Sequence, residues 1–263
     1  MLNSFSFQPE KDRRQKYLGS LLSDAGYQVI LAENTPDLDI KAAELSEREN
    51  AVFVLLPVPV SSTLLSQIKH RLNPAHIVLG GNLPKDFLAF CEEQQILTID
   101  YMKFQSVAMK NAVATAEGAI CQAITSSDIN LHKSRCLVIG FGKCGEILAA
   151  KLQALGCQVW VSTRDELAKA KAFAYGYEEH DSYDNYDFIF NTAPALVITP
   201  SVIDKLKTDT VIIDIASKPG GCDFNYCIQK GITAKHCPGL PGKYAPKSSA
   251  DIIYEEITKT LCL

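Results

Sequence analysis

The fold is decided by the stretch RCLVIGFGKCGEIL, which occupies residues 135–148. In this stretch an apolar run rich in β-branched residues enters a G-x-G-x-x-G turn, and helix-forming residues follow directly. Gly140 permits a tight turn, Gly142 lets a pyrophosphate approach the backbone, and Gly145 lets the helix pack close to the strand. The N-terminus of that helix favours an anion because its first N–H groups lack intrahelical partners. The pattern predicts a Rossmann dinucleotide-binding unit.

The second strand of this unit, expected over residues 158–162, ends in a polar tip. An acidic residue at this tip typically binds the ribose 2′-hydroxyl of NAD, but here the tip reads Ser162-Thr163-Arg164. Hydroxyl and guanidinium groups suit a 2′-phosphate, so we predict NADP, with NAD less favoured. Asp165 follows closely and weakens that preference. The alternative, a surface loop with an incidental arginine, stays open.

Two further loops follow the strands expected over residues 188–191 and 211–214. Open parallel sheets bind ligands at the carboxyl ends of their strands, so we expect these loops to flank the nicotinamide. Turn punctuation by proline and glycine is the alternative. Cys144 either carries a thiolate favoured by the helix N-terminus or simply fills the turn as a small residue. The predicted cofactor contacts are Gly140, Gly142, Lys143, Cys144, Gly145, Ser162, Thr163, Arg164, Asn191, Thr192, Ala193, Pro194, Ile215 and Ala216.

Composition narrows the function classes. The 263 residues suit one or two domains. The net charge of −4 provides no positive surface charge to attract nucleic acid or anionic lipid. The N-terminus lacks signal-peptide order and no run of about 18 apolar residues exists, so we expect a cytoplasmic protein. Nine scattered cysteines and five histidines form no cluster with metal-ligand spacing, so we expect neither a metal site nor a disulfide framework.

The order of elements predicts an α/β protein with two doubly wound parallel sheets, a flavodoxin-like N-terminal domain and a Rossmann domain. We place the first domain at residues 1–108, a connecting helix at 109–130 and the Rossmann domain at 131–247, with the final helix, 248–263, a candidate to pack back on the first domain. Strands are expected at 27–32, 51–56, 76–79, 96–100, 136–139, 159–162, 188–191, 211–214 and 233–236, and helices at 11–25, 62–71, 84–93, 109–124 and 248–261.

Two segments offer groups for a substrate. Residues 238–248 are expected to form an extended loop shaped by proline and glycine, with Lys243 and Lys247 available to pair with carboxylates. Both lysines are equally well explained as solvated surface charges. In the connecting helix, Asn111 and Thr115 interrupt alanines and aliphatics, and such groups need partners, either from the facing domain or from a ligand.

These motifs together resemble the A subunit of dipicolinate synthase from spore-forming bacteria, over nearly the whole chain and in the same order. The resemblance implies oxidation of a dihydrodipicolinate-type compound to dipicolinate (pyridine-2,6-dicarboxylate), with NADP⁺ as the hydride acceptor, on a branch of the lysine pathway. It further implies that the partner is the flavoprotein-like B subunit of the synthase, and that the protein acts during sporulation, in the cytoplasm of the mother cell. The stretches that carry the resemblance are 57–61, 76–81, 111–120, 140–142, 214–221, 223–224, 238–243 and 245–247.

One departure from the family concerns the N-terminus. The family opens with a strand, a Gly-Gly-Asp turn and an Arg-Gln pair, whereas the glycines are missing here and only Asp12, Arg14 and Gln15 are in place to match. A role of this turn in substrate binding is therefore in doubt. Ala114 also stands where the family commonly has proline.

For the substrate we expect Arg14, Lys243 and Lys247 to neutralise carboxylates, and Asn111, Thr115 and Ser217 to orient the ring. No residue can be named as the general base. Another two-domain dehydrogenase, of the 2-hydroxyacid, alanine or shikimate type, is the alternative within the same chemistry. A non-catalytic regulatory protein that binds a nucleotide is the alternative from another class. The sequence leaves open whether the chain forms a homo-oligomer.

Overall fold

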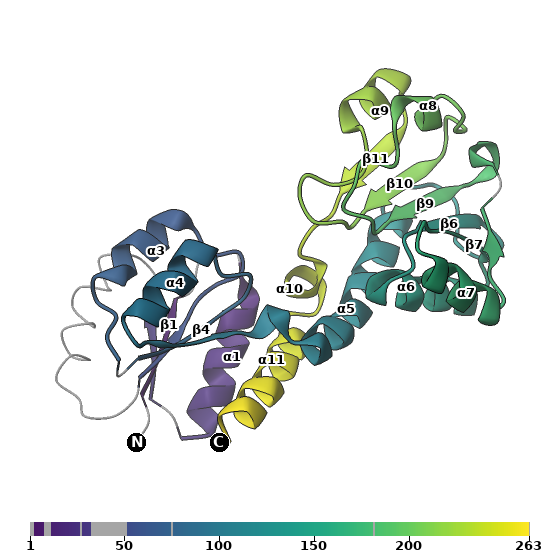
Figure 1. Ribbon diagram of the computed structural model, residues 1–263. Helices are drawn as coiled ribbons and strands as arrows, with labels where there is room; N and C mark the ends of the chain where they lie inside the picture. Colours follow the sequence, from purple (N-terminus) through teal and green to yellow (C-terminus); the bar gives the residue numbers. More distant parts are fainter. Residues whose placement is uncertain are drawn as a thin grey trace. The chain divides into compact units, whose positions relative to one another are not determined.

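The computed structural model describes residues 3–7, 12–26, 28–32, 52–74, 76–180 and 182–262. The chain divides into two compact units (Figure 1): Met1–Lys110 with Ala245–Leu263, and Asn111–Tyr244. The second unit therefore begins within the helix that the sequence marks as a connector, and the C-terminal segment groups with the N-terminal unit.

The first unit contains a parallel five-stranded sheet in the order β2-β1-β3-β4-β5. This 2-1-3-4-5 order is the flavodoxin-like arrangement, so the predicted fold class is confirmed. Its elements are β1 (Asn3–Phe7), α1 (Arg13–Asp24), β2 (Gln28–Ala32), β3 (Val52–Leu55), α3 (Ser62–Lys69), β4 (His76–Gly80), α4 (Lys85–Glu93), β5 (Leu97–Asp100), the short 3₁₀ helix η1 (Tyr101–Lys103) and α11 (Pro246–Leu261).

Alternating side chains of the central strands supply a separate core on each face of this sheet. Val54 and Val78 pack in one apolar cluster with α3 and α4, while Leu55 and Leu79 pack in another with α1 and α11. Because successive residues of a strand point to opposite faces, an unbroken apolar strand needs helices on both sides. In Figure 1, α11 lies alongside α1, and these two helices pack extensively on each other.

The second unit contains a parallel six-stranded sheet in the order β11-β10-β9-β6-β7-β8. When the strands are renumbered from β6 as 1, the sheet read from β8 to β11 has the order 3-2-1-4-5-6. This is the Rossmann arrangement. Its elements are α5 (Gln105–Ile124, of which residues 105–110 belong to the first unit), β6 (Arg135–Ile139), α6 (Lys143–Ala154), β7 (Gln158–Ser162), α7 (Glu166–Ala174), β8 (Glu178–Glu179), the 3₁₀ helix η2 (Tyr183–Asn185), β9 (Phe188–Asn191), α8 (Pro200–Ile203), β10 (Val211–Asp214), α9 (Phe224–Lys230), β11 (Thr233–His236) and α10 (Leu240–Tyr244).

The two faces of this sheet are covered by different helices. Val138 of β6 packs into a cluster with α5 and α6, and its neighbour Leu137 packs into the cluster of α8 and α9. Both strand residues are fully buried. The glycine turn after β6 is therefore held by strands and helices with continuous apolar cores, which gives a rigid base for a binding site.

The expectation of an extended loop at residues 238–248 is wrong, because α10 lies within it and α11 begins at Pro246. Proline at the first helical position starts a helix readily because that position needs no N–H donor. The connecting helix also begins earlier than predicted, at Gln105, and ends at Ile124. Within the described ranges, no helix is long and apolar enough to cross a bilayer, and no group of three potential ligands is placed to hold a metal ion.

Candidate functional site

The glycine turn after β6 has the geometry of a nucleotide cradle. Gly140 adopts a φ of +89°, and a Cβ at this position would collide with the Thr192 hydroxyl. A Cβ at Gly145 would collide with the carbonyl oxygen of Gly140, so the close contact between α6 and the turn requires glycine. At Gly142, by contrast, a Cβ would meet nothing within 4 Å. The second glycine therefore leaves open space at the N-terminus of α6.

This open space lies at the point where the strand order reverses. β6 pairs with β7 on one side and with β9 on the other, and the chain leaves these strands at Gly140, Thr163 and Thr192. The Thr192 N–H and hydroxyl both donate to Ile139 O, at 2.8 Å and 3.0 Å. Ligands of open α/β sheets bind in the crevice at such a switch point. The predicted contacts at 140–145, 162–164 and 192–194 therefore share one edge of the sheet.

A pocket of about 390 Å³ lies between the glycine turn and the tip of β7 and is lined in part by Gly142, Lys143, Thr163 and Asp165. Asp165 is the N-cap of α7, and its Oδ1 accepts the Ala168 N–H at 2.7 Å. Lys143 and Arg164 are exposed and have no ion pair or side-chain hydrogen bond within the described ranges. The acidic side chain nearest the tip is thus engaged in helix capping, whereas the two cations remain available.

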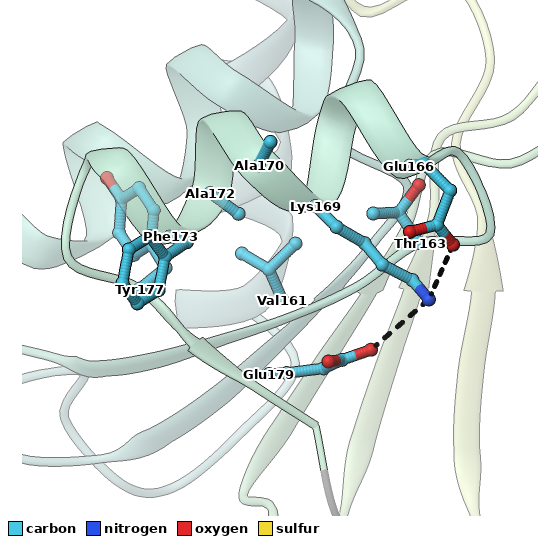
Figure 2. Close-up of a pocket in the computed structure, with 9 residues that line it drawn as sticks. All are labelled: Val161, Thr163, Glu166, Lys169, Ala170, Ala172, Phe173, Tyr177 and Glu179. Carbon is cyan, nitrogen blue, oxygen red and sulfur yellow. Dashed lines mark ion pairs between the residues drawn. The ribbon is translucent and has the colours of Figure 1, made fainter.

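A second hollow, of about 380 Å³, lies between α7 and the edge of the sheet, and Figure 2 shows the residues that line it. Lys169 lies between two carboxylates there, with its Nζ 3.1 Å from Glu166 and 3.7 Å from Glu179. Phe173 and Tyr177 lie at the opposite, apolar end. Two carboxylates and one ammonium group give this hollow a net negative charge, which disfavours binding of an anion such as phosphate.

Asn191 and Asp214 link the loops that follow β9 and β10. Both side chains are fully buried, and Asn191 Nδ2 donates to Asp214 Oδ1 at 2.9 Å. Asp214 also accepts the N–H groups of Ala216 and Gly221, at 3.0 Å and 2.6 Å. Asn191 further closes its own turn, accepting the Ala193 N–H and donating to the Ala193 carbonyl. These two side chains hold the loops in place and have their hydrogen-bonding groups engaged in doing so.

The loop after β10 carries the predicted contacts Ile215, Ala216 and Ser217. The Ile215 N–H donates to Asn191 O at 2.9 Å, and Ser217 is exposed. His236, at the end of β11, places its Nε2 2.9 Å from Ala216 O. A carbonyl only accepts hydrogen bonds, so this nitrogen carries the proton. The histidine stabilises the loop from the side opposite to Asn191.

α5 contributes Asn111 and Thr115, and both lie in the second unit. Asn111 is buried, and the Thr115 hydroxyl donates to Asn111 O at 2.9 Å. Thr115 also lies beside Cys144 in the first turn of α6, where burial raises the pKa of the Cys144 thiol. Raising the pKa opposes thiolate formation, so the structure favours the interpretation of Cys144 as a small residue that fills the turn.

Lys243 lies in α10, which packs on α5. A Cβ at Gly118 of α5 would come within 2.9 Å of Leu240, and Gln122 donates a hydrogen bond to the Tyr244 hydroxyl. Lys243 is exposed and, within the described ranges, has no ion pair. The second unit thus brings Lys243 onto a helix adjacent to the one that carries Thr115. Lys247, also exposed, is in the first turn of α11 and belongs to the first unit.

Arg14 is engaged within the first unit. Its Nε and Nη2 donate to the two oxygens of Asp12 at 2.7 Å and 2.9 Å, and Nη2 also donates to Val58 O at 2.9 Å. Asp12 in turn accepts the Val58 N–H at 3.0 Å. Neutralised by Asp12 and buried, Arg14 is a weaker partner for a substrate carboxylate than Lys243. Residues 8–11, which include part of the family's N-terminal turn, lie outside the described residues.

Asp214, which holds the loop after β10, was not singled out by the sequence reasoning. It ends an apolar strand, and a carboxylate directly after such a strand signals a buried acceptor for loop N–H groups. The role of Asp165 as a helix cap was also missed, although an aspartate three residues before the Ala168 N–H is a common capping arrangement.

The comparisons with known proteins agree with this geometry. Residues 106–217 match the family model of the NAD-binding domain of D-isomer-specific 2-hydroxyacid dehydrogenases. The dipicolinate synthase A subunit of Bacillus subtilis (strain 168) is 31% identical over 195 residues, which cover 72% of this chain and 66% of that protein. The crystal structure of the dipicolinate synthase A subunit from Bacillus halodurans superposes with a TM-score of 0.81 at 26% identity, covering 100% of this chain and 97% of the other.

A glutamyl-tRNA reductase of Campylobacter jejuni (strain RM1221) is 28% identical over 213 residues, covering 74% of this chain and 48% of that enzyme. The matched part thus spans about half the length of that relative, and about two thirds of the length of the B. subtilis protein. Each of these matches includes a large part of the unit that contains the glycine turn.

Proposed function

Because the chain belongs to the family of dipicolinate synthase A subunits, we propose that it oxidises dihydrodipicolinate to dipicolinate with NADP⁺ as the hydride acceptor. The observation that carries the proposal is the open position at Gly142, between an uncapped helix N-terminus and the tip of β7. The match to a dehydrogenase NAD-binding domain supports an oxidoreductase with a nicotinamide cofactor.

The residues of the second unit fit such a cofactor. A pyrophosphate next to Gly142 would accept hydrogen bonds from the first N–H groups of α6, with Lys143 as a neighbouring cation. The adenosine ribose would lie at the tip of β7. The backbone of 193–194 and 215–216, fixed by Asn191 and Asp214, would border the nicotinamide. When bound, the cofactor supplies a carbon that accepts a hydride.

NADP is favoured by the distribution of charge at the β7 tip. Arg164 is exposed with no ion pair within the described ranges, and Ser162 and Thr163 add hydroxyl groups. The Asp165 carboxylate, which would otherwise bind the 2′-hydroxyl of NAD, is engaged at the start of α7. A guanidinium binds a phosphate well because its N–H groups match the oxygens in pairs.

For the substrate, the roles follow from charge and position. Lys243, on α10, is the stronger candidate for a carboxylate, since Arg14 is paired with Asp12. Thr115 and Ser217 offer hydroxyl groups that orient the ring. Oxidation removes a hydride and a proton from the dihydropyridine, and the gain of aromaticity drives the reaction, so the protein's task is mainly orientation and charge neutralisation.

The family also directs a proposal about partners. Its members are named as one component of a synthase, so we expect this chain to work with the dipicolinate synthase B subunit, which is flavoprotein-like. We place this activity in the cytoplasm of the mother cell during sporulation, on a branch of the lysine pathway. Pull-down of the co-expressed B subunit by the tagged chain tests the partnership, and two proteins that elute separately at micromolar concentration contradict it.

The test of the reaction combines the purified chain with NADP⁺ and freshly generated dihydrodipicolinate, and follows dipicolinate and reduced-nucleotide absorbance together. Matched reactions use NAD⁺, no enzyme, and the added B subunit. Enzyme-dependent formation of both products supports the proposal. Nucleotide binding without turnover, with and without the B subunit, contradicts it and favours a regulatory nucleotide-binding protein.

The Lys243→Ala variant tests the substrate contact. We expect KM for the dicarboxylate to rise about tenfold, because one charge-assisted hydrogen bond is lost, with the affinity for NADP⁺ unchanged. Lys235→Ala, at an exposed position of β11, is the matched lysine control. An unchanged KM in Lys243→Ala removes this residue from the site.

A further inference from the structure

Two cysteines that the proposed reaction does not use lie against each other at the start of α9. Asp223 is the N-cap of this helix, and its Oδ1 accepts the Tyr226 N–H at 3.0 Å. Cys222 directly precedes the cap and Cys227 is the fourth residue of the helix, with the two sulfurs 3.5 Å apart. These are the two positions that form a hydrophobic staple at a helix start, here made of two thiols.

We propose that Cys222 and Cys227 are an oxidation site, at which a hydroperoxide such as hydrogen peroxide converts the thiol staple into a disulfide. In the first step one sulfur attacks a peroxide oxygen, the O–O bond breaks, and a sulfenic acid and one water are formed. The second sulfur then attacks the sulfenic sulfur, the S–S bond forms, and a second water leaves. The two sulfurs lose two electrons in total, which reduce the peroxide to two molecules of water.

The environment of the pair supports this chemistry. The two sulfurs are within hydrogen-bonding distance and either thiol can donate; a hydrogen bond from Cys222 lowers the pKa of Cys227, which favours the thiolate that attacks the peroxide. Cys227 is fully buried and Cys222 is 7% exposed, so a small oxidant is favoured over a bulky disulfide. Cys144, in contrast, has a pKa raised by burial and neighbours the Thr115 hydroxyl.

A second close pair, Cys136 and Cys157, serves as an internal comparison. The Cys157 thiol donates to Leu131 O at 3.2 Å, and Cys136 lies 3.4 Å from the Ser134 hydroxyl. These sulfurs are buried to the same extent as the staple, with Cys136 0% and Cys157 7% exposed, and the hydrogen bond from Cys136 lowers the pKa of Cys157 to about 7. The staple, by contrast, joins residues only five positions apart at a loop, where a small local shift can close the bond.

Oxidation of the staple would act on the loop that precedes it. Cys222 follows Gly221, whose N–H donates to Asp214 and whose carbonyl accepts the N–H groups of Val197 and Ile198. A disulfide brings the sulfurs from 3.5 Å to about 2.05 Å, and so draws Cys222 toward α9. The displacement reaches the loop of residues 215–221 through Gly221. Weaker nucleotide binding after oxidation is therefore expected, and this consequence rests on the proposed function.

The first experiment maps the disulfide in the intact chain. Reduced protein is treated with hydrogen peroxide, alkylated under denaturing conditions, digested with trypsin and measured by mass spectrometry. Trypsin does not cut before Pro219, so both cysteines remain in the peptide of residues 208–230. We expect this peptide to become lighter by two hydrogen atoms and to resist alkylation, with reversal by dithiothreitol. The exposed Cys262 is the control for oxidation. If peroxide oxidises Cys262 while Cys222 and Cys227 are still fully alkylated, the proposal is overturned.

Variants separate this pair from the other thiols. Cys222→Ser and Cys227→Ala should abolish the protected peptide, whereas Cys136→Ser should leave it unchanged. The mapping in the unsubstituted chain decides the proposal even if a variant fails to fold. A disulfide between Cys227 and any cysteine other than Cys222 overturns it.

The second experiment measures NADP⁺ affinity of the reduced and oxidised chain by calorimetric titration. We expect oxidation to weaken binding by about fivefold, reversibly. An unchanged affinity with a mapped disulfide overturns the effect on the nucleotide site. Failure of the reduced chain to bind any nicotinamide nucleotide contradicts the proposed function, while the peptide mapping still decides whether the staple oxidises.

Discussion

Asp12 and Gly142 occupy the same structural position in the two units and have opposite effects. Each is the N-cap of the helix that follows the first strand of its sheet. The Asp12 carboxylate accepts the Arg14 backbone N–H and the Nε and Nη2 groups of the Arg14 guanidinium, so the start of α1 is filled by the chain's own anion. Gly142 has no side chain, and the start of α6 is left open.

This difference shows that a parallel sheet and a helix N-terminus do not by themselves make an anion site. Both units have doubly wound parallel sheets with polar groups at the carboxyl ends of strands. In the first unit, Asp100 at the end of β5 is engaged by its own loops, since it accepts the N–H groups of Asn82, Leu83 and Met102. In the second unit Lys143 and Arg164 remain exposed beside open space. Ligand binding requires donors that the fold leaves unused.

The largest effect is expected from Asp12→Ala. Arg14 is buried, with 8% of the residue exposed. The change leaves its guanidinium without a carboxylate partner. We expect the free energy of unfolding to fall by about 3–5 kcal/mol, the usual cost of an unpaired buried charge. Urea unfolding measures it, with Asp24→Ala at the exposed end of α1 as the control. A loss below about 1 kcal/mol would show that Asp12 is not the counter-ion that stabilises this turn.

Gly142→Asp transfers the self-capped arrangement to the second unit. The carboxylate would occupy the space intended for a pyrophosphate, so we expect NADP⁺ affinity to fall at least about 100-fold. The helix should gain about 1 kcal/mol from the new cap, which thermal unfolding detects. Ala150→Asp adds the same charge at an exposed position of α6 and serves as the control. Nucleotide binding that survives in Gly142→Asp would place the pyrophosphate elsewhere.

Arg164→Ala tests the charge left free at the tip of β7. Removing one guanidinium–phosphate contact should weaken NADP⁺ binding about tenfold, with NAD⁺ binding unchanged. Parallel titrations with both nucleotides give the ratio, and Arg13→Ala, an exposed arginine of the first unit, controls for net charge. An equal loss for both nucleotides would mean that Arg164 does not contact the 2′-phosphate.

The smallest effect concerns His76, at the start of β4. Burial lowers the pKa of His76, and its Nδ1 accepts the Asn73 N–H at 3.0 Å. The unfolded chain binds the proton more tightly, so the stability that His76 contributes is complete above about pH 6.5 and falls as the pH drops toward the lowered pKa. His76→Gln should flatten this dependence in urea unfolding of the first unit, and exposed His70→Gln should not. The opposite slope would show that His76 is stabilised in its charged form.

Local pattern was sufficient for most of the fold. The alternation of apolar strands and amphipathic helices predicted both sheets, because strand and helix periodicities are properties of neighbouring residues. Strands β1 and β8 and helices α7, α8 and α9 were not predicted. β8, α8 and α9 have only two to seven residues and carry little periodicity, and β1, which pairs with both β2 and β3, has only two apolar residues among its five. α10 was mistaken for a loop because its proline and glycine suggest a turn, whereas in the structure it is a helix packed on Gly118.

The sequence by itself determined the glycine turn, because the three glycines act within six residues of one another and their steric roles are local. Only the tertiary structure decided which charged groups remain free. Arg14 is paired with Asp12 and also donates to the carbonyl of Val58, 44 residues away. Asn191 donates to Asp214, 23 residues away. Lys143 and Arg164 meet no such partner within the described ranges. A hydrogen bond depends on which groups folding brings within about 3 Å, and for partners this far apart in the chain residue spacing carries no such information.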